Sequence, residues 1–93
     1  MYIKYTEMEF EFDSAKSMSN LVKHGIDFDD AKQLWRDPRV LIVRARQVTE
    51  PRWVAIGRIG ANYWSAIFTY RGERIRIISV RCSRVKEIAL YES

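Results

Sequence analysis

Three arginines of the segment R-I-R-I-I-S-V-R at 74–81 have side chains that suit a phosphate group: Arg74, Arg76 and Arg81. Arginine carries a planar fork of N–H donors that matches phosphate oxygens. The segment is typical of a β-strand, whose alternation predicts Arg74 and Arg76 on one face and Ser79 and Arg81 on the other. The alternative is that these arginines only protect an exposed strand from aggregation.

A second polar group lies nearer the start of the chain. Lys16, Asn20 and Lys23 are spaced i, i+4 and i+7, with His24 beside them, so a helix would carry all four on one side. Lysine and histidine are side chains that transfer protons in catalysis. Two plainer interpretations stay open. The residues can form an ordinary solvated face, and the two cations at 23 and 24 suit the negative end of a helix dipole.

A third set, Arg84, Glu87 and Tyr91, is spaced i, i+3 and i+7 near the end of the sequence. This spacing predicts that the three side chains share one side of a final helix. The arginine and the glutamate can also be read as a surface ion pair.

The chemistry open to these residues is narrow. The sequence has no serine-hydrolase motif and no glycine-rich phosphate loop. The single cysteine, Cys82, cannot form an internal disulfide, and with the single histidine it cannot complete a four-ligand zinc site, so we expect no metal and no cofactor. RNA carries its own nucleophile, because its 2′-hydroxyl can attack the neighbouring phosphate. A protein then has to supply a base, an acid and positive charge, which clustered Lys, His and Arg side chains provide.

The charge distribution also favours a polyanionic partner. The 93 residues contain 16 Lys and Arg and 12 Asp and Glu, for a net charge of +4. Residues 1–35 hold seven acids and four bases (−3), whereas residues 36–93 hold five acids and twelve bases (+7). Eleven of the bases are arginine, which suits phosphates. An acidic protein partner is the alternative, and the two are compatible.

The length and the pattern of the sequence predict one α+β domain over residues 1–93. We expect a strand near 9–12, helices near 14–24 and from Asp27 to Asp37-Pro38, strands near 40–44, 52–58, 63–70 and 74–80, and a last helix capped by Ser83. This β-α-α-β-β-β-β-α order predicts an antiparallel sheet with the helices packed on one face. In the first helix, Ala15, Met18 and Leu21/Val22 are expected to face the core. No apolar run is long enough for a membrane span and the start is unlike a signal peptide, so we expect a cytoplasmic protein with no membrane partner.

Several motifs resemble one protein family. The string F-x-F-D-x-x-K-x-x-x-N-x-x-K-H-G-I-x-F-x-x-A at 10–31, the pair D-P at 37–38, the strand ending I-G-R at 56–58 and R-G-x-R-I-R-I-I-S-x-R at 71–81 are similar to the BrnT toxins. The resemblance covers essentially the whole chain. The family often has Trp where this chain has Phe12 and Ala where it has Val80. Cys82 and the arginine-rich stretch 40–52 are further departures.

The resemblance implies a fold like that of the RelE-type ribonucleases and a toxin that is neutralised by a ribbon-helix-helix antitoxin, BrnA. DNA would be contacted only indirectly, through the antitoxin complex. Position by position, the resemblance points to a site made of Lys23, His24, Arg58, Arg76, Ser79, Arg81, Arg84 and Tyr91.

Two hypotheses follow. The first is a metal-independent endoribonuclease that inhibits translation by cleaving RNA. The residues expected in catalysis are Lys23, His24, Arg76 and Arg81, and those expected to bind substrate are Arg58, Arg74, Ser79, Arg84 and Tyr91. The second is a non-catalytic module that binds a DNA-binding antitoxin or regulator and contributes to autorepression. The first hypothesis requires the late-strand arginines and the Lys-His end of the first helix to converge on one cleft.

Overall fold

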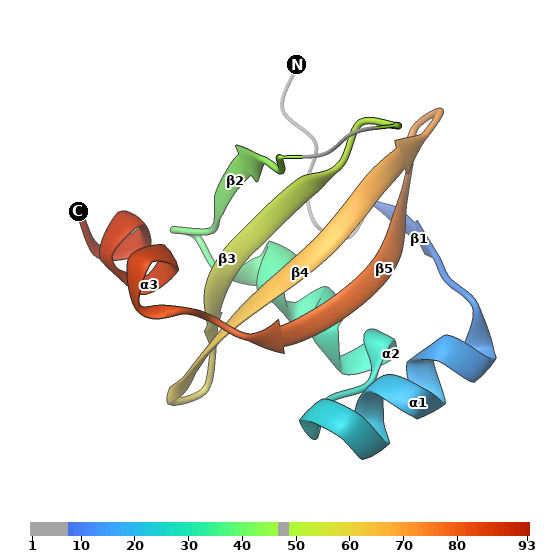
Figure 1. Cartoon of the computed structure of the whole chain (residues 1–93), viewed down its shortest axis with the longest axis horizontal. Coiled ribbons are helices and arrows are strands. Elements are labelled where there is room, and N and C mark those ends of the chain that lie inside the picture. Colours follow the sequence, from blue (N-terminus) through green and yellow to red (C-terminus); the bar gives the residue numbers. More distant parts are fainter. Residues whose placement is uncertain (1–7, 47–48) are drawn as a thin grey trace.

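A five-stranded β-sheet forms the centre of the computed structural model, which describes residues 8–46 and 49–93 (Figure 1). The elements are β1 (Glu9–Glu11), α1 (Ser14–His24), α2 (Phe28–Ala31), a 3₁₀ helix η2 (Lys32–Arg36), β2 (Leu41–Arg44), β3 (Trp53–Ile59), β4 (Asn62–Arg71), β5 (Arg74–Cys82) and α3 (Val85–Glu92). The predicted α+β class is confirmed, while the 3₁₀ helix was not predicted. The radius of gyration of 12.6 Å is close to the value of about 12 Å for a single compact domain of this length.

The sheet is mixed, so the prediction of a purely antiparallel sheet was wrong. The strand order is β1-β5-β4-β3-β2, and β2 to β5 pair antiparallel with their neighbours. β1 pairs parallel with β5, with Glu9 opposite Arg74 and Glu11 opposite Arg76. Tight hairpin turns force antiparallel pairing, but β1 and β5 are joined by most of the chain, which leaves their relative direction free.

One face of the sheet carries the larger core. Phe28, Leu34 and Trp35 of α2 and η2 pack there against Phe68 of β4 and Ile77 of β5. The rings of Trp35 and Phe68 meet edge to face with their centroids 5.2 Å apart. Burial of these large side chains holds α2 and η2 on the sheet.

α3 packs on the opposite face, so the prediction that all helices share one face was also wrong. Tyr91 of α3 forms a second buried cluster with Val54 and Ile56 of β3. β3 is buried on both sides, because Ala55, which alternates with those residues, belongs to the larger core. A continuous apolar run such as W-V-A-I is typical of a strand covered on both faces.

α1 begins and ends where the sequence predicted. The Asp13 side chain accepts a hydrogen bond from the backbone N–H of Lys16 at 3.0 Å, and Gly25 ends the helix at φ 83°. Asp27 caps α2 in the same way. At α3 the cap is Arg84 rather than the expected Ser83.

The orientation of α1 is the reverse of the prediction. Met18 is 65 % exposed and Val22 is 88 % exposed, whereas Ser17 and Asn20 are buried. β1 pairs only with residues 74–76 of β5, so the rest of that strand edge needs other hydrogen-bond partners. The Asn20 side chain supplies them: its Nδ2 donates to the carbonyl oxygens of Val80 at 2.9 Å and Ile26 at 2.8 Å, and its Oδ1 accepts from the Val80 N–H at 3.2 Å. α1 therefore turns its polar side inward.

A β-bulge in β5 changes which residues share a face. Phe68 of β4 pairs with Ile77, but Ile67 pairs with Ser79, so Ile78 is an extra residue on β5. The predicted alternation across 74–81 was therefore wrong. Ser79 and Arg81 lie on the same face as Arg74 and Arg76, which is the face that α3 covers at one end.

The described helices include none that is both long enough and apolar enough to cross a membrane.

Candidate functional site

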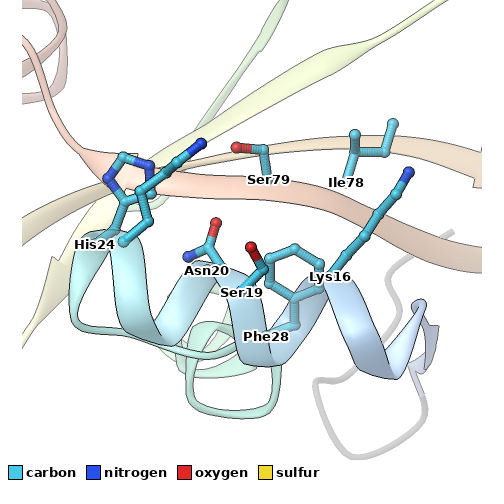
Figure 2. Close-up of a pocket in the computed structure, with 8 residues that line it drawn as sticks. Lys16, Ser19, Asn20, His24, Phe28, Ile78 and Ser79 are labelled. Carbon is cyan, nitrogen blue, oxygen red and sulfur yellow. The ribbon is translucent and has the colours of Figure 1, made fainter.

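A groove lies between α1 and β5 (Figure 2). Its lining residues are Lys16, Ser19, Asn20, Lys23, His24, Phe28, Ile78 and Ser79. Its volume is about 160 Å³, below the 300–1,000 Å³ that is typical of pockets for drug-sized ligands, so it suits a group the size of a phosphate. Figure 2 shows Lys16 and His24 toward opposite ends of the groove and Ser79 on the strand between them.

Helical spacing and the bulge bring these groups together. Lys16, Asn20 and Lys23 share one side of α1, as their i, i+4 and i+7 spacing predicted, and His24 lies in the last turn of the helix. The extra residue Ile78 sets the register that brings Ser79 to this groove. Three of the predicted site residues, Lys23, His24 and Ser79, therefore line one groove.

The arginine row, Arg74, Arg76 and Arg81, lies along β5 on the same face as Ser79, and each member is paired with an acid. Arg74 contacts Glu9 at 3.4 Å and Glu11 at 3.9 Å. Arg76 Nη1 donates to Glu11 Oε2 at 2.8 Å. The Arg74 side chain is 60 % exposed, so its pairs are screened by water and hold it only weakly.

Arg81 is held most firmly. Its two terminal nitrogens donate to the two carboxylate oxygens of Glu87 in α3, at 2.7 and 2.8 Å. Glu87 also accepts hydrogen bonds from the Arg84 backbone N–H at 2.8 Å and from the Ser65 hydroxyl at 3.0 Å. The hydrogen bonds from Arg81, aided by these donors, lower the pKa of Glu87 to about 2 although burial opposes the shift. The same pair raises the pKa of Arg81.

Tyr91 takes part in a buried contact at the far end of α3. Its hydroxyl donates to Asp37 Oδ2 at 2.6 Å, and the backbone N–H of Arg58 donates to the same oxygen at 2.9 Å. Burial acts to raise the pKa of Asp37, but these hydrogen bonds and one from the Arg39 backbone outweigh it and hold the pKa below its usual value. A Cβ at Gly57 would meet Asp37 Oδ2 at 3.0 Å, which explains why glycine precedes Arg58 here.

The other two predicted site residues lie apart from the groove. The Arg58 guanidinium lies over the Tyr63 ring, 5.2 Å from its centroid, and β3 is separated from β5 by β4. Arg84 is exposed at the start of α3.

The predicted site residues therefore fall into four places: the groove, the arginine row beside it, the far end of α3 near Tyr91 and Arg58, and the start of α3, where Arg84 lies. Two residues outside the predicted set belong with them. Lys16 lines the groove, and its spacing from Asn20 and Lys23 was the signal that pointed to it. Asp37 ties α3 to β3; the D-P pair that contains it was noted as a helix end and as part of the family resemblance, but not as a site residue.

Comparisons with known proteins identify the family. A search of curated proteins gave no match. Residues 12–87 match the family described as "Ribonuclease toxin, BrnT, of type II toxin-antitoxin system". The matched range contains the groove and the arginine row and ends before Tyr91. Because this match covers most of the 93 residues, the chain belongs to the BrnT family of ribonuclease toxins of type II toxin–antitoxin systems.

Proposed function

We propose that the chain is a metal-independent endoribonuclease whose groove between α1 and β5 holds the phosphate that is cut, and that its cleavage of RNA inhibits translation. The observation that carries this proposal is the presence of Lys23, His24 and Ser79 in one groove, next to a row of arginines on the same strand as Ser79. Family membership supports the ribonuclease class.

The reaction needs no group outside the chain and its substrate. The 2′-oxygen of RNA forms a bond to the adjacent phosphorus, and the bond from phosphorus to the 5′-oxygen of the next nucleotide breaks. Lys23 or His24 accepts the proton of the 2′-hydroxyl, and a second protonated group returns one to the leaving 5′-oxygen. The products are a 2′,3′-cyclic phosphate and a 5′-hydroxyl end.

Positive charge next to the groove would stabilise the transition state. Arg76 and Arg81 flank Ser79 along β5, and Glu11 and Glu87 hold their guanidinium groups in fixed positions. Fixed donors stabilise developing charge better than mobile ones because they need not reorganise during the reaction. The RNA backbone on either side of the cleaved phosphate would be contacted by three other arginines. Arg74 is more exposed than Arg76 and Arg81, and Arg58 and Arg84 lie farther from the groove. Tyr91 would act through Asp37, by keeping α3 in place.

The protein partner would be a ribbon-helix-helix antitoxin. A type II toxin has a protein antitoxin, and the resemblance to BrnT proteins points to the BrnA type. Contact with DNA would then pass through the antitoxin.

Cleavage of a labelled RNA in EDTA tests this function. We expect cleavage to continue in EDTA, to leave cyclic phosphate and 5′-hydroxyl ends, and to stop when the nucleotide before the cut lacks its 2′-hydroxyl. Arg81→Ala should slow cleavage roughly 30- to 1,000-fold, the effect of losing about 2–4 kcal/mol of transition-state stabilisation. Arg81→Lys keeps the charge but loses the paired donors, so its cleavage rate should lie between those of the unaltered chain and of Arg81→Ala. A requirement for added metal, or 5′-phosphate ends, would overturn the proposal.

A non-catalytic module remains the second candidate, and one observation favours it: every member of the arginine row already pairs with a carboxylate of the chain. Such a row can be a structural feature rather than a phosphate site. Expression of the chain without its antitoxin separates the two. Growth arrest that Lys23→Ala or Arg76→Ala relieves supports the nuclease, whereas unchanged growth supports the module.

A further inference from the structure

The outward side of α1 carries an apolar stripe made of Ala15, Met18, Leu21 and Val22, called the outer stripe here. Met18 is 65 %, Leu21 41 % and Val22 88 % exposed, and Ala15 is exposed as well. The buried residues of the helix, Ser17 and Asn20, point the other way, into the domain. Figure 1 shows α1 at the edge of the molecule, and the exposed fractions of these side chains indicate that no other described element covers them.

The outer stripe is unusual within this protein. Single exposed apolar side chains are normal on a protein surface, but a contiguous set marks a surface that contacts something else. The other large exposed apolar residues of the described chain are Ile42, Tyr70, Val85 and Leu90, and they come from β2, β4 and two positions five residues apart on α3. Only α1 combines three of them within five residues of one helix.

The charges of α1 indicate what kind of partner covers the stripe. The helix contains Lys16, Lys23 and no acidic residue, although residues 1–35 as a whole are acidic. Within residues 8–46 and 49–93, neither lysine side chain forms an ion pair or a hydrogen bond. Both lie on the groove side of the helix, along one flank of the stripe. A partner that fits this surface is apolar along its centre and acidic along one side.

We propose that the outer stripe is the docking surface for the antitoxin, which presents an apolar segment to Met18 and Val22 and acidic side chains to Lys16 and Lys23. A second copy of this chain fits the surface less well, because it would bring the same two lysines against the stripe. An antitoxin is a protein partner that a type II toxin requires.

Docking on α1 would also explain neutralisation. Lys23 and His24 line the groove and belong to the last turn of the same helix. Acidic groups drawn to Lys23 would occupy the place of an RNA phosphate and cover the entrance to the groove. This step rests on the proposed function, whereas the docking surface itself does not.

The test measures binding of the chain's cognate antitoxin to the purified chain, by calorimetry. We expect Val22→Asp and Met18→Asp each to weaken binding roughly tenfold or more, because each would place an unpaired charge in an apolar contact. Val85→Asp is a matched control: Val85 is 84 % exposed on another helix, and its change should leave the affinity unaltered. Unchanged affinity in both stripe variants, or an equal loss in Val85→Asp, would overturn the proposal.

Two further measurements distinguish antitoxin docking from a failure of the proposed function and from self-association. Val22 does not line the groove, so Val22→Asp should remain folded at the assay temperature and still cleave RNA. If the unaltered chain fails to cleave RNA, the proposed function fails while the binding result still stands. If sedimentation shows the isolated chain to be a dimer that Val22→Asp separates, the stripe is a self-association surface and the inference is overturned.

Discussion

α1 and α3 both contact the sheet through polar groups, but the positively charged side chains at the two helices differ in whether they have an acidic partner. At α1, Asn20 and Ser17 bond to backbone groups, and the side chains of Lys16, Lys23 and His24 have no ion-pair or hydrogen-bond partner within residues 8–46 and 49–93. At α3, one of the polar contacts to the sheet is an ion pair, Arg81 with Glu87. The charge at the α3 end is thus held in place by an ion pair of the fold, whereas the charged side chains at the α1 end have no such partner within the described residues.

The difference has a physical origin in what each helix has to satisfy. α1 lies along a strand edge with unpaired N–H and C=O groups, which a neutral amide can satisfy as both donor and acceptor. α3 lies over a face that carries Arg81, a half-buried guanidinium that only an acid can neutralise. Changes at the two helices should therefore affect stability and activity in different proportions.

The largest effect on stability is expected at the α1 contact, from Asn20→Asp. The change keeps the shape of the side chain but removes both donations, and it turns a carboxylate toward the carbonyl oxygens of Ile26 and Val80. We expect the free energy of unfolding at pH 7 to fall by about 3 kcal/mol, because buried acceptors lose their partners. Urea denaturation measures it.

Asn62→Asp is the matched control for that change. Asn62 is exposed at the start of β4, so the same chemical change should alter the free energy of unfolding by less than about 0.5 kcal/mol. Equal losses in both variants would mean that the Asn20 amide does not hold α1 to the strand edge.

The next effect is a pH dependence at the α3 contact. The pKa of Glu87 is about 2 in the folded chain against an ordinary 4.5, so its carboxylate stabilises the fold above pH 4.5 and this contribution is lost as the pH falls toward 2. We expect the unaltered chain to lose on the order of 2 kcal/mol more than Glu87→Gln over this range. Denaturation curves at several pH values between 2 and 6 measure the difference.

Glu73→Gln provides the comparison for the pH series, because Glu73 lies exposed in the turn between β4 and β5. That variant should follow the unaltered chain throughout. If Glu87→Gln also follows it, the ion pair contributes nothing to stability, and the contrast between the two helices disappears.

A smaller effect is expected at the far end of α3. Tyr91→Phe removes one hydrogen bond to Asp37, which keeps its two backbone donors from Arg39 and Arg58. We expect a loss of about 1 kcal/mol in the free energy of unfolding. RNA cleavage at a temperature where the variant stays folded should be unchanged, and a large loss of cleavage would instead assign Tyr91 to the site.

The sequence predicts a structural feature well when that feature depends on contacts between residues close together in the chain. Asp13, Gly25 and Asp27 mark helix ends through contacts within a few residues, and the predicted bounds of the 14–24 helix and the predicted start of the next helix at Asp27 were confirmed. The shared side of Lys16, Asn20 and Lys23 is local in the same sense, and the groove contains all three.

Features set by distant pairing could not be predicted in this way. The bulge at Ile78 depends on how β4 meets β5, and it moved Ser79 and Arg81 to the other face. The apolar spacing of Ala15, Met18 and Val22 correctly indicates an amphipathic helix, but spacing does not say whether the apolar side meets this chain or another one. Here the free edge of β5 determined the orientation of α1.

Lys23→Ala is expected to have the smallest effect on stability. It should also separate stability from activity most clearly. Lys23 is exposed on α1, so its loss should change the free energy of unfolding by less than about 0.5 kcal/mol. If Lys23 transfers a proton in the groove, RNA cleavage should nevertheless fall roughly 100-fold or more, the usual effect of removing a general acid or base. Val22→Ala, one position away on the outer stripe, should alter neither quantity. A Lys23 variant that keeps full cleavage would leave His24 as the proton-transfer group, and full cleavage in both Lys23→Ala and His24→Ala would remove the functional contrast between α1 and α3.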